Sequence, residues 1–175
     1  MPATFIPIAT SIVTSASSQV TISSIPSTYD HLIVRCSTRT SAAVNISSFT
    51  LRFNSDSGSN YYGGYIFSEG TVAGGSSGSG TSHSTGGTIY MAGANVFNDL
   101  FSINELTIFN YKNTSYKKTI GHLSGVAGDA AGFHGVGFGG GIWNSTSAIT
   151  SIDFLAGGGN FVVGSSFRLY GISNS

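Results

Sequence analysis

Few residues in this sequence could carry chemistry, and their spacing matches no catalytic or metal-binding pattern. Cys36 is the single cysteine, so neither an intrachain disulfide nor a thiolate metal site can form. The four histidines are not spaced as metal ligands are; they are His31, His83, His122 and His134. We therefore expect no cofactor and no metal ion, although a trimer could gather three copies of one histidine on its axis.

The seven acidic residues are scattered along the chain. Hydrolysis of a glycosidic bond requires two carboxyl groups that face each other across one cleft, within about 10 Å. Asp30 and Asp56 stand among turn-forming residues. Asp56, with Gly58 and Asn60, resembles half of a calcium loop, but no acidic ligand follows at the required spacing. These patterns predict a protein that is not an enzyme, with a glycan hydrolase as a less favoured alternative.

Two glycine-rich motifs match functional sequence patterns but lack the neighbouring strand or helix that those patterns require. Residues 135–140 fit GxGxxG, yet a dinucleotide site requires a helix to begin there. Ile142, Trp143 and an Asn-Ser-Thr turn follow instead, which favours glycines in a strand against which other groups pack closely. Residues 74–78 fit GxSxG, but they lie in low-complexity sequence without the strand and helix of a nucleophile elbow.

The charge balance also limits the possible partners. Only 8% of the residues are charged, and seven basic residues balance seven acidic ones. Binding along a nucleic acid requires clustered Lys and Arg, so we expect no nucleic-acid partner. A net charge near zero favours association with other protein subunits. No stretch of 18 apolar residues occurs, so we expect no membrane span.

Alternation of apolar and polar residues recurs along the chain and predicts strands with two different faces. It is clearest at residues 31–38, 49–53 and 166–172. About ten such segments occur, separated by Gly, Ser and Asn, and only residues 95–101 could form a helical turn. We therefore predict an all-β fold: a single antiparallel β-sandwich, jelly-roll-like, with almost no helix.

The turn signals suggest how this domain is organised. Residues 1–14 are predicted as an N-terminal arm or edge strand, and residues 15–175 as the sandwich domain. Residues 54–58 are a turn signal that we interpret as a hairpin between the flanking strands. Residues 71–87 are almost entirely Gly, Ser, Thr and Ala, which predicts a long flexible loop.

Two segments are candidates for contact with a partner. The N-terminal segment is apolar and contains a proline, which suits an edge strand or a segment laid along a neighbouring subunit. The second segment is a group of tyrosines, and tyrosine is enriched where protein surfaces meet partners or sugars. Alternate tyrosines could instead lie in the core. The candidate residues are Phe5, Ile6, Pro7, Ile8, Tyr61, Tyr62 and Tyr65.

Four stretches together carry a family resemblance: IPIAT at 6–10, SIPSTYDHLIVR at 24–35, IWNSTSAITSIDF at 142–154 and GNFVVGSSFRLYGI at 159–172. With them the chain resembles short, Gly/Ser/Thr-rich virion surface proteins of tailed bacteriophages, notably phages of aquatic and cyanobacterial hosts. The segment 52–62 resembles them more loosely, and the middle of the chain is not covered.

The resemblance implies a small β-sandwich on the outside of a virion, commonly a homotrimer, made in the host cytoplasm. As a capsid cement or decoration protein, it would bind the shell and stabilise contacts between copies of the major capsid protein. As a tail-fibre or receptor-binding protein, it would contact host surface glycans. The absence of coiled-coil heptads and of a repetitive shaft favours the capsid.

Overall fold

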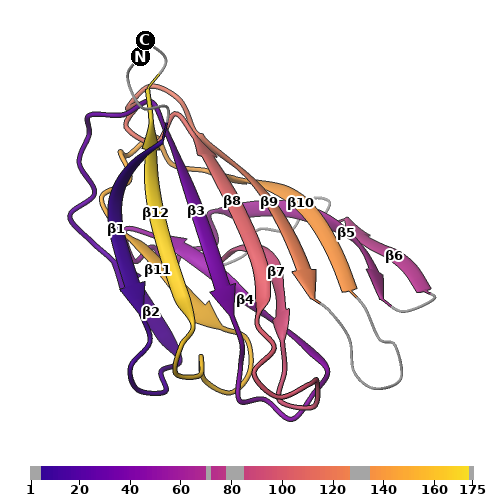
Figure 1. Ribbon diagram of the computed structural model, residues 1–175. Helices are drawn as coiled ribbons and strands as arrows, with labels where there is room; N and C mark the ends of the chain where they lie inside the picture. Colours follow the sequence, from indigo (N-terminus) through magenta and orange to yellow (C-terminus); the bar gives the residue numbers. More distant parts are fainter. Residues whose placement is uncertain (1–4, 70–71, 78–84, 127–134, 174–175) are drawn as a thin grey trace.

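The computed structural model describes residues 5–69, 72–77, 85–126 and 135–173, which form twelve β-strands and no helix. The strands make two antiparallel sheets, so the predicted all-β sandwich is confirmed, with more strands than the ten expected (Figure 1). The larger sheet runs in the order β1-β12-β3-β8-β9-β10-β5-β6, and the smaller in the order β2-β11-β4-β7.

The strand bounds follow the predicted alternation closely. The larger sheet contains β1 (Ile6–Ile12), β12 (Ser166–Ile172), β3 (His31–Thr38), β8 (Ser102–Phe109), β9 (Lys118–Val126), β10 (Gly135–Trp143), β5 (Tyr61–Glu69) and β6 (Val72–Ser77). The smaller sheet contains β2 (Gln19–Ile22), β11 (Ile152–Ala156), β4 (Ile46–Phe53) and β7 (Gly86–Ala92).

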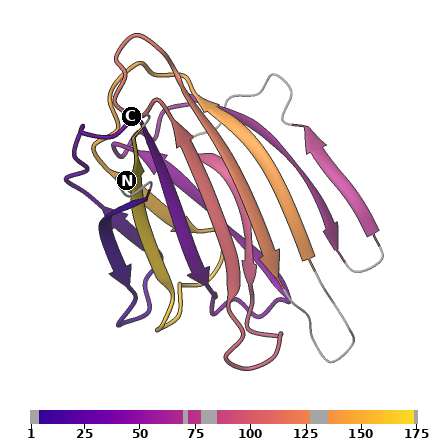
Figure 2. The ribbon, with the colours of Figure 1, turned by 45° about the horizontal axis from the view of Figure 1, so that its top comes forward.

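Eight of the strands have jelly-roll topology. One half of the larger sheet has the strand order β1-β12-β3-β8. The strands that adjoin these four in the chain have the matching order β2-β11-β4-β7 in the smaller sheet. Each of the pairs β1/β2, β3/β4, β7/β8 and β11/β12 therefore crosses between the sheets, as in a jelly roll of two Greek keys. The other four strands extend the larger sheet past β8, toward the right of Figure 2.

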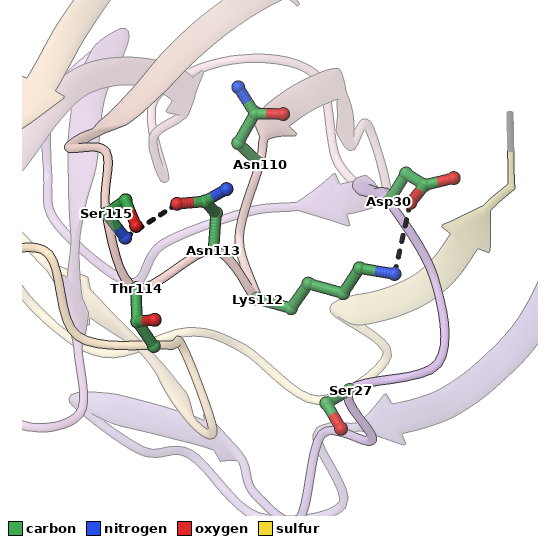
Figure 3. Close-up of a pocket in the computed structure, with 7 residues that line it drawn as sticks. All are labelled: Ser27, Asp30, Asn110, Lys112, Asn113, Thr114 and Ser115. Carbon is green, nitrogen blue, oxygen red and sulfur yellow. Dashed lines mark hydrogen bonds and ion pairs between the residues drawn. The ribbon is translucent and has the colours of Figure 1, made fainter.

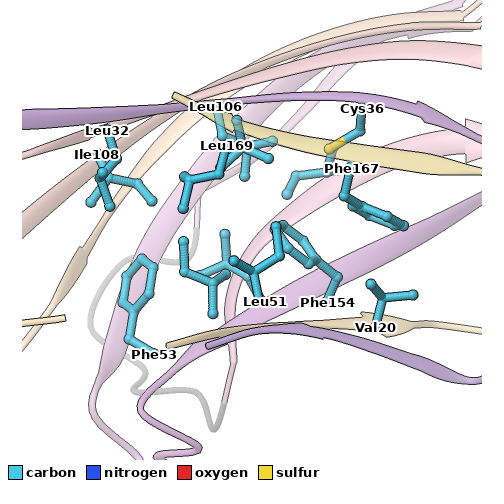
Figure 4. Packing of buried hydrophobic residues seen from close by; sticks show 14 of the residues in the cluster. Val20, Leu32, Cys36, Leu51, Phe53, Leu106, Ile108, Phe154, Phe167 and Leu169 are labelled. Atoms are coloured by element: carbon cyan, nitrogen blue, oxygen red, sulfur yellow. The ribbon is translucent and has the colours of Figure 1, made fainter. Parts of the chain in front are cut away.

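The core lies between the two sheets and is rich in phenylalanine. Leu51 of β4 and Phe154 of β11 face Phe167 and Leu169 of β12 across it (Figure 4). The rings of Phe154 and Phe167 are 4.6 Å apart between centroids. Such close aromatic pairs add about 0.5–1.5 kcal/mol each beyond the burial of their apolar area.

The glycines of β10 bring the extension of the larger sheet close to β7. A Cβ atom at Gly135 would lie 2.5 Å from Ile46 Cδ1, and one at Gly137 would lie 2.9 Å from Tyr90 Cδ2. At Gly139 it would lie 2.6 Å from His122 Nε2. The prediction that residues 135–140 belong to a strand with close packing, and not to a phosphate loop, is therefore confirmed.

The hairpin predicted around residues 54–58 is wrong. β4 belongs to the smaller sheet and β5 to the larger, so the turn crosses from one sheet to the other. Asn54 and Ser55 adopt positive φ values of 53° and 55°. The Asn54 side chain holds the crossing to a distant loop, because its oxygen accepts from the amides of Thr150 and Ser151. Turn residues signal a reversal but not which sheet the chain enters next.

The loop predicted at residues 71–87 is wrong in part. Val72–Ser77 form β6, which pairs along β5 with Phe67 opposite Gly74. Backbone pairing with β5 outweighs the low strand propensity of Gly and Ser here. Gly86 and Gly87 already belong to β7. Residues 71 and 78–84 lie outside the described residues.

The helical turn predicted at residues 95–101 is also wrong, because these residues wrap around a buried arginine. The Arg39 guanidinium donates to the carbonyl oxygens of Phe97 (2.6 Å), Leu100 (3.1 Å), Ala94 (3.3 Å) and Val96 (3.5 Å). Carbonyl groups that converge on one cation cannot also point along a helix axis.

We predict that Arg39→Met lowers the free energy of unfolding by about 2–4 kcal/mol, because it leaves several buried carbonyl groups without donors. Urea denaturation followed by circular dichroism measures the change. Lys117→Met is the matched control: Lys117 is exposed in the connection before β9, and its loss is expected to stay within about 0.5 kcal/mol. Equal losses for the two variants would contradict this role for Arg39.

Candidate interaction surfaces

The face of the larger sheet that points away from the smaller sheet, here called the outer face, exposes many large apolar side chains. They come from β5, β8, β9 and β10 and include Ile103, 76% exposed, and Phe138, 57% exposed. The complete set is Tyr62, Ile66, Ile103, Phe109, Leu123, Val136, Phe138 and Ile142. A soluble monomer rarely leaves so many neighbouring apolar groups in water, so this surface is a candidate interface.

Strand register arranges these side chains in rows that cross the strands. Phe138 lies opposite Ile66 on one side and Leu123 on the other, which forms one apolar row. Ile142 lies opposite Tyr62 and belongs to a second row. Side chains directly opposite one another on one face of a sheet contact each other, so each row is a continuous ridge.

A row of glycines separates these two ridges. Gly140 lies opposite Gly64 in β5 and Gly121 in β9. Rows on one face of a sheet are about 7 Å apart, because side chains alternate and each residue rises about 3.4 Å. The outer face thus carries a trough between two ridges, floored by the backbone of three strands.

Charged side chains are few on the outer face. Among the described strands they are Arg35, Glu105 and Arg168, which lie in register with one another. Arg35 Nε pairs with Glu105 Oε2 at 2.8 Å, and the Arg35 guanidinium lies 5.3 Å from the Phe5 ring centroid. The charges therefore continue the row of Phe138 and Leu123 across β8, β3 and β12, since Glu105 lies opposite Leu123.

The N-terminal candidates lie on or beside an edge strand of the larger sheet. β1 pairs antiparallel with β12, and its other edge is free among the described strands. Phe5 and Pro7 are exposed, Ile6 is half-buried, and Ile8 packs against the core. Phe5 and Pro7 are thus available to a partner, while Ile8 stabilises the protein's own fold.

The three tyrosine candidates point to different faces of the larger sheet, because side chains alternate along β5. Tyr61 is 1% exposed, its ring stacks on Trp143, and its hydroxyl accepts from the Phe53 amide at 2.9 Å. The prediction that Tyr61 contacts a partner is therefore corrected: it is a core residue. Tyr65 also points inward, onto Tyr90. Tyr62 is exposed on the outer face.

A polar pocket that sequence reasoning missed opens between two loops (Figure 3). It has a volume of about 480 Å³ and is lined by Ser27, Asp30, Asn110, Lys112, Asn113, Thr114 and Ser115. Lys112 Nζ pairs with Asp30 Oδ1 at 3.0 Å, and Asn113 Oδ1 accepts from the amide of Ser115. Its lining of donors and acceptors suits a small polar ligand. These residues are common turn formers far apart in sequence, so no local pattern joins them.

The residues singled out for chemistry have structural contacts. Asp153 accepts from the hydroxyls of Thr21 and Ser55. His31 Nδ1 accepts from the Asn110 amide at 3.1 Å. Burial raises the pKa of the Cys36 thiol. Within the described residues no group of His, Cys, Asp and Glu could hold a metal ion. His83 and His134 lie outside those residues.

Asp56 stabilises the segment in which the chain crosses from β4 in the smaller sheet to β5 in the larger sheet. Its carboxylate accepts from Trp143 Nε1 at 2.7 Å, from the Gly58 amide at 2.8 Å and from the Asn60 side chain at 3.0 Å. The hydrogen bond from Trp143 is the main reason why the pKa of Asp56 lies below its usual value. The half calcium loop is thus a turn held by its own side chains.

β9 carries two buried basic side chains on its inner face. Lys118 Nζ donates to the carbonyl oxygens of Asn113, Tyr116 and Thr146, and burial lowers its pKa. His122 is 7% exposed, and its Nδ1 atom has no hydrogen-bond partner. Burial lowers the pKa of His122 to about 4. Neither group faces solvent as a catalytic base would.

We predict that His122 makes the fold sensitive to mild acid. Below about pH 6.5 the unfolded chain binds a proton at this residue, whereas folded His122 stays neutral down to about pH 4, so stability falls as pH falls through this window. The loss between pH 7 and about pH 4.5 is roughly 2–3 kcal/mol. Urea denaturation at both pH values is expected to show this loss in the wild type and in His31→Gln, but a smaller one in His122→Leu. Equal losses in all three would refute the assignment.

Asp56→Asn is expected to destabilise the fold by about 1–3 kcal/mol, because a charged acceptor of three hydrogen bonds is lost. The contribution of Asp56 is present above its ordinary pKa and disappears as pH falls through its lowered value. Fluorescence of Trp143 during denaturation reports the change directly. Asp99→Asn is the control, since Asp99 is exposed and Asn tolerates its positive φ of 62°. A destabilisation as small as that of the control would argue against the Asp56 hydrogen bonds.

Comparison with known proteins yields little. No protein-family model and no curated protein matches the sequence. Among solved structures, the chain is similar to the crystal structure of Caenorhabditis elegans galectin LEC-6, with a TM-score of 0.33 and 12% sequence identity over 94% of this chain and 96% of that chain. The described part of this chain contains no helix long and apolar enough to span a membrane. The fold and the proposed function therefore rest on this chain's own residues.

Proposed function

We propose that this protein is a structural protein of a bacteriophage virion, a cement or decoration protein on the outer surface of the capsid. The observation that carries the proposal is the edge of β1, which is free among the described strands and exposes Phe5 and Ile12. The sequence resemblance to phage virion proteins supplies the setting. Binding of this protein would stabilise contacts between neighbouring major capsid subunits.

The surface chemistry supports a role in assembly. Seven basic and seven acidic residues balance, so long-range repulsion does not oppose close packing of copies on a shell. Four of the described acids, Asp30, Asp56, Glu105 and Asp153, are bound in ion pairs or hydrogen bonds. These charged side chains therefore stabilise the protein's own fold, and burial of apolar surface is the main force available for binding a partner.

The edge strand β1 is the proposed point of attachment to the shell. A free sheet edge can add a strand from another protein, with main-chain hydrogen bonds for affinity and side chains for specificity. Phe5 and Ile12, at the two ends of this segment, are 43% and 55% exposed. Pro7 lacks an N–H group, so it limits the register in which a capsid strand can pair.

We predict that the double variant Phe5→Ser/Ile12→Ser binds capsids at least about tenfold more weakly, because two apolar anchors are lost while the fold is kept. Capsids lacking the protein are mixed with each variant and sedimented, and the bound protein is quantified. Val163→Ser is the control, since Val163 is 61% exposed in the loop before β12. Wild-type occupancy of the double variant would contradict attachment through β1. Deletion of residues 1–13 is a blunter test, because it also removes β1 from the sheet.

A second candidate function is that of a receptor-binding protein of the phage tail. The polar pocket favours it, because Lys112, Asp30 and the surrounding amide and hydroxyl groups could hydrogen-bond a host surface glycan. Glycan-array binding that is lost in Lys112→Ala would support this function. Electron cryomicroscopy of the intact virion distinguishes the two functions by placing the protein on the shell or on the tail.

A further inference from the structure

We infer that the outer face pairs two copies of this chain face to face, around a two-fold axis. This inference does not depend on the proposed capsid role. It identifies what covers the exposed apolar side chains of β5, β8, β9 and β10. The argument for a second copy comes from the shape of the face, from its charges and from its area.

The shape of the face is complementary to itself. A two-fold axis that runs along the rows, midway between the row of Phe138 and the row of Gly140, turns the ridge of Phe138 onto the trough of the other copy, and the ridge of Ile142 onto the partner's row of Val136. Phe138 then lies over the partner's Gly140, and Leu123 over the partner's Gly121, by the register of β9 and β10. The interdigitation of side chains from two sheets about 10 Å apart is the ordinary way in which sheets pack.

The fold itself does not require a glycine at position 121 of the trough. A Cβ atom at Gly121 would meet nothing within 4 Å, whereas one at Gly140 would lie close to the Ile120 carbonyl oxygen, at 3.2 Å. The inward-facing glycines of β10 differ, since a Cβ atom at Gly135 or Gly139 would clash. Glycine weakens a strand, so glycines in open space indicate that another surface lies close to them.

The charges of the face are compatible with this pairing. Arg35, Glu105 and Arg168 all belong to the row of Phe138. In the dimer the same axis places these three residues over the partner's row of Gly140. That row continues into Thr107, Ile33 and Tyr170, and it carries no charge. Arg168 therefore meets the partner's Tyr170, a favourable contact between a cation and an aromatic ring. No like charges face each other.

The area of the face is sufficient for a stable dimer. The seven strands from β12 to β6, each about 4.8 Å wide and with about seven residues at about 3.4 Å per residue, cover roughly 800 Å² and leave β1 outside the interface. A standard interface buries about 800 Å² on each partner. A glycan is a poorer occupant of the trough, because the backbone groups of β9 and β10 already pair within the sheet.

The oligomeric state of the full chain tests the inference. Analytical ultracentrifugation of the wild type is expected to show a dimer at about 100 μM. Phe138→Lys would bury an unpaired charge in the dimer, since its cross-strand neighbours are Ile66 and Leu123, and should weaken pairing about hundredfold or more. Val163→Lys adds the same charge at an exposed apolar residue outside the outer face and should leave the dimer intact. A monomeric or trimeric wild type, or equal behaviour of the two variants, would overturn the inference.

Gly121→Val separates pairing from folding. The added side chain has open space in one copy, so the thermal midpoint of the monomer is expected to stay the same or to rise. The same side chain fills the trough and should prevent the dimer. A Gly121→Val protein that is folded and still dimeric would contradict the proposed interface.

Cross-linking tests the register. A mixture of Leu123→Cys and Gly121→Cys proteins should form a covalent dimer with a thiol-reactive cross-linker about 5 Å long, whereas neither variant alone should, because facing sheets lie about 10 Å apart and a disulfide is too short. Cys36 is buried and serves as an unreactive background. Equal cross-linking in the mixture and in the single variants would reject the two-fold axis. Capsid binding by Phe5→Ser/Ile12→Ser is measured separately, so failure of either proposal leaves the other standing.

Discussion

The close approach of β10 to β7 is the constraint on which the extended sheet depends. Sheets normally lie about 10 Å apart because side chains fill the space between them. Here Gly135 and Gly137 remove the side chains from one sheet, and Ile46 of β4 and Tyr90 of β7 occupy the space that results, while Gly139 leaves room for His122 of the neighbouring strand β9. A larger residue at these glycines would push the extension away from the jelly roll. The outer face would then lose its support.

Charge is used in this protein mainly to hold loops. Arg39 gathers four carbonyl groups of the loop before β8, Lys118 gathers three between β9 and its neighbouring loops, and Asp56 closes the crossing from β4 to β5. Each satisfies polar groups that a chain with little helix and many loops leaves unpaired. The remaining surface is unusually poor in charge, which is consistent with a protein that functions when packed against others.

Much of the fold could be predicted because alternation of apolar and polar residues depends only on the two faces of a strand. It located β3 and most of β12, but it left open which tyrosines of β5 point inward. It could not show that β4 and β5 enter different sheets, since Asn54 and Ser55 make a turn in either case. It could not predict β6 or the loop around Arg39 either, because pairing with β5 and hydrogen bonds to a distant arginine are tertiary effects. The outer face and the polar pocket arise from strand register and loop proximity, which no local pattern records.

The pairing of the first strand with the last has a consequence for how the protein is made. Ile6 lies opposite Gly171, so the edge that carries Phe5 and Ile12 exists only after the C-terminal strand has left the ribosome. Contacts between residues so distant in sequence form slowly, because the chain must close a long loop before they stabilise it. Chains that stop before β12 therefore lack the edge proposed for attachment, so only chains that include β12 could attach through it.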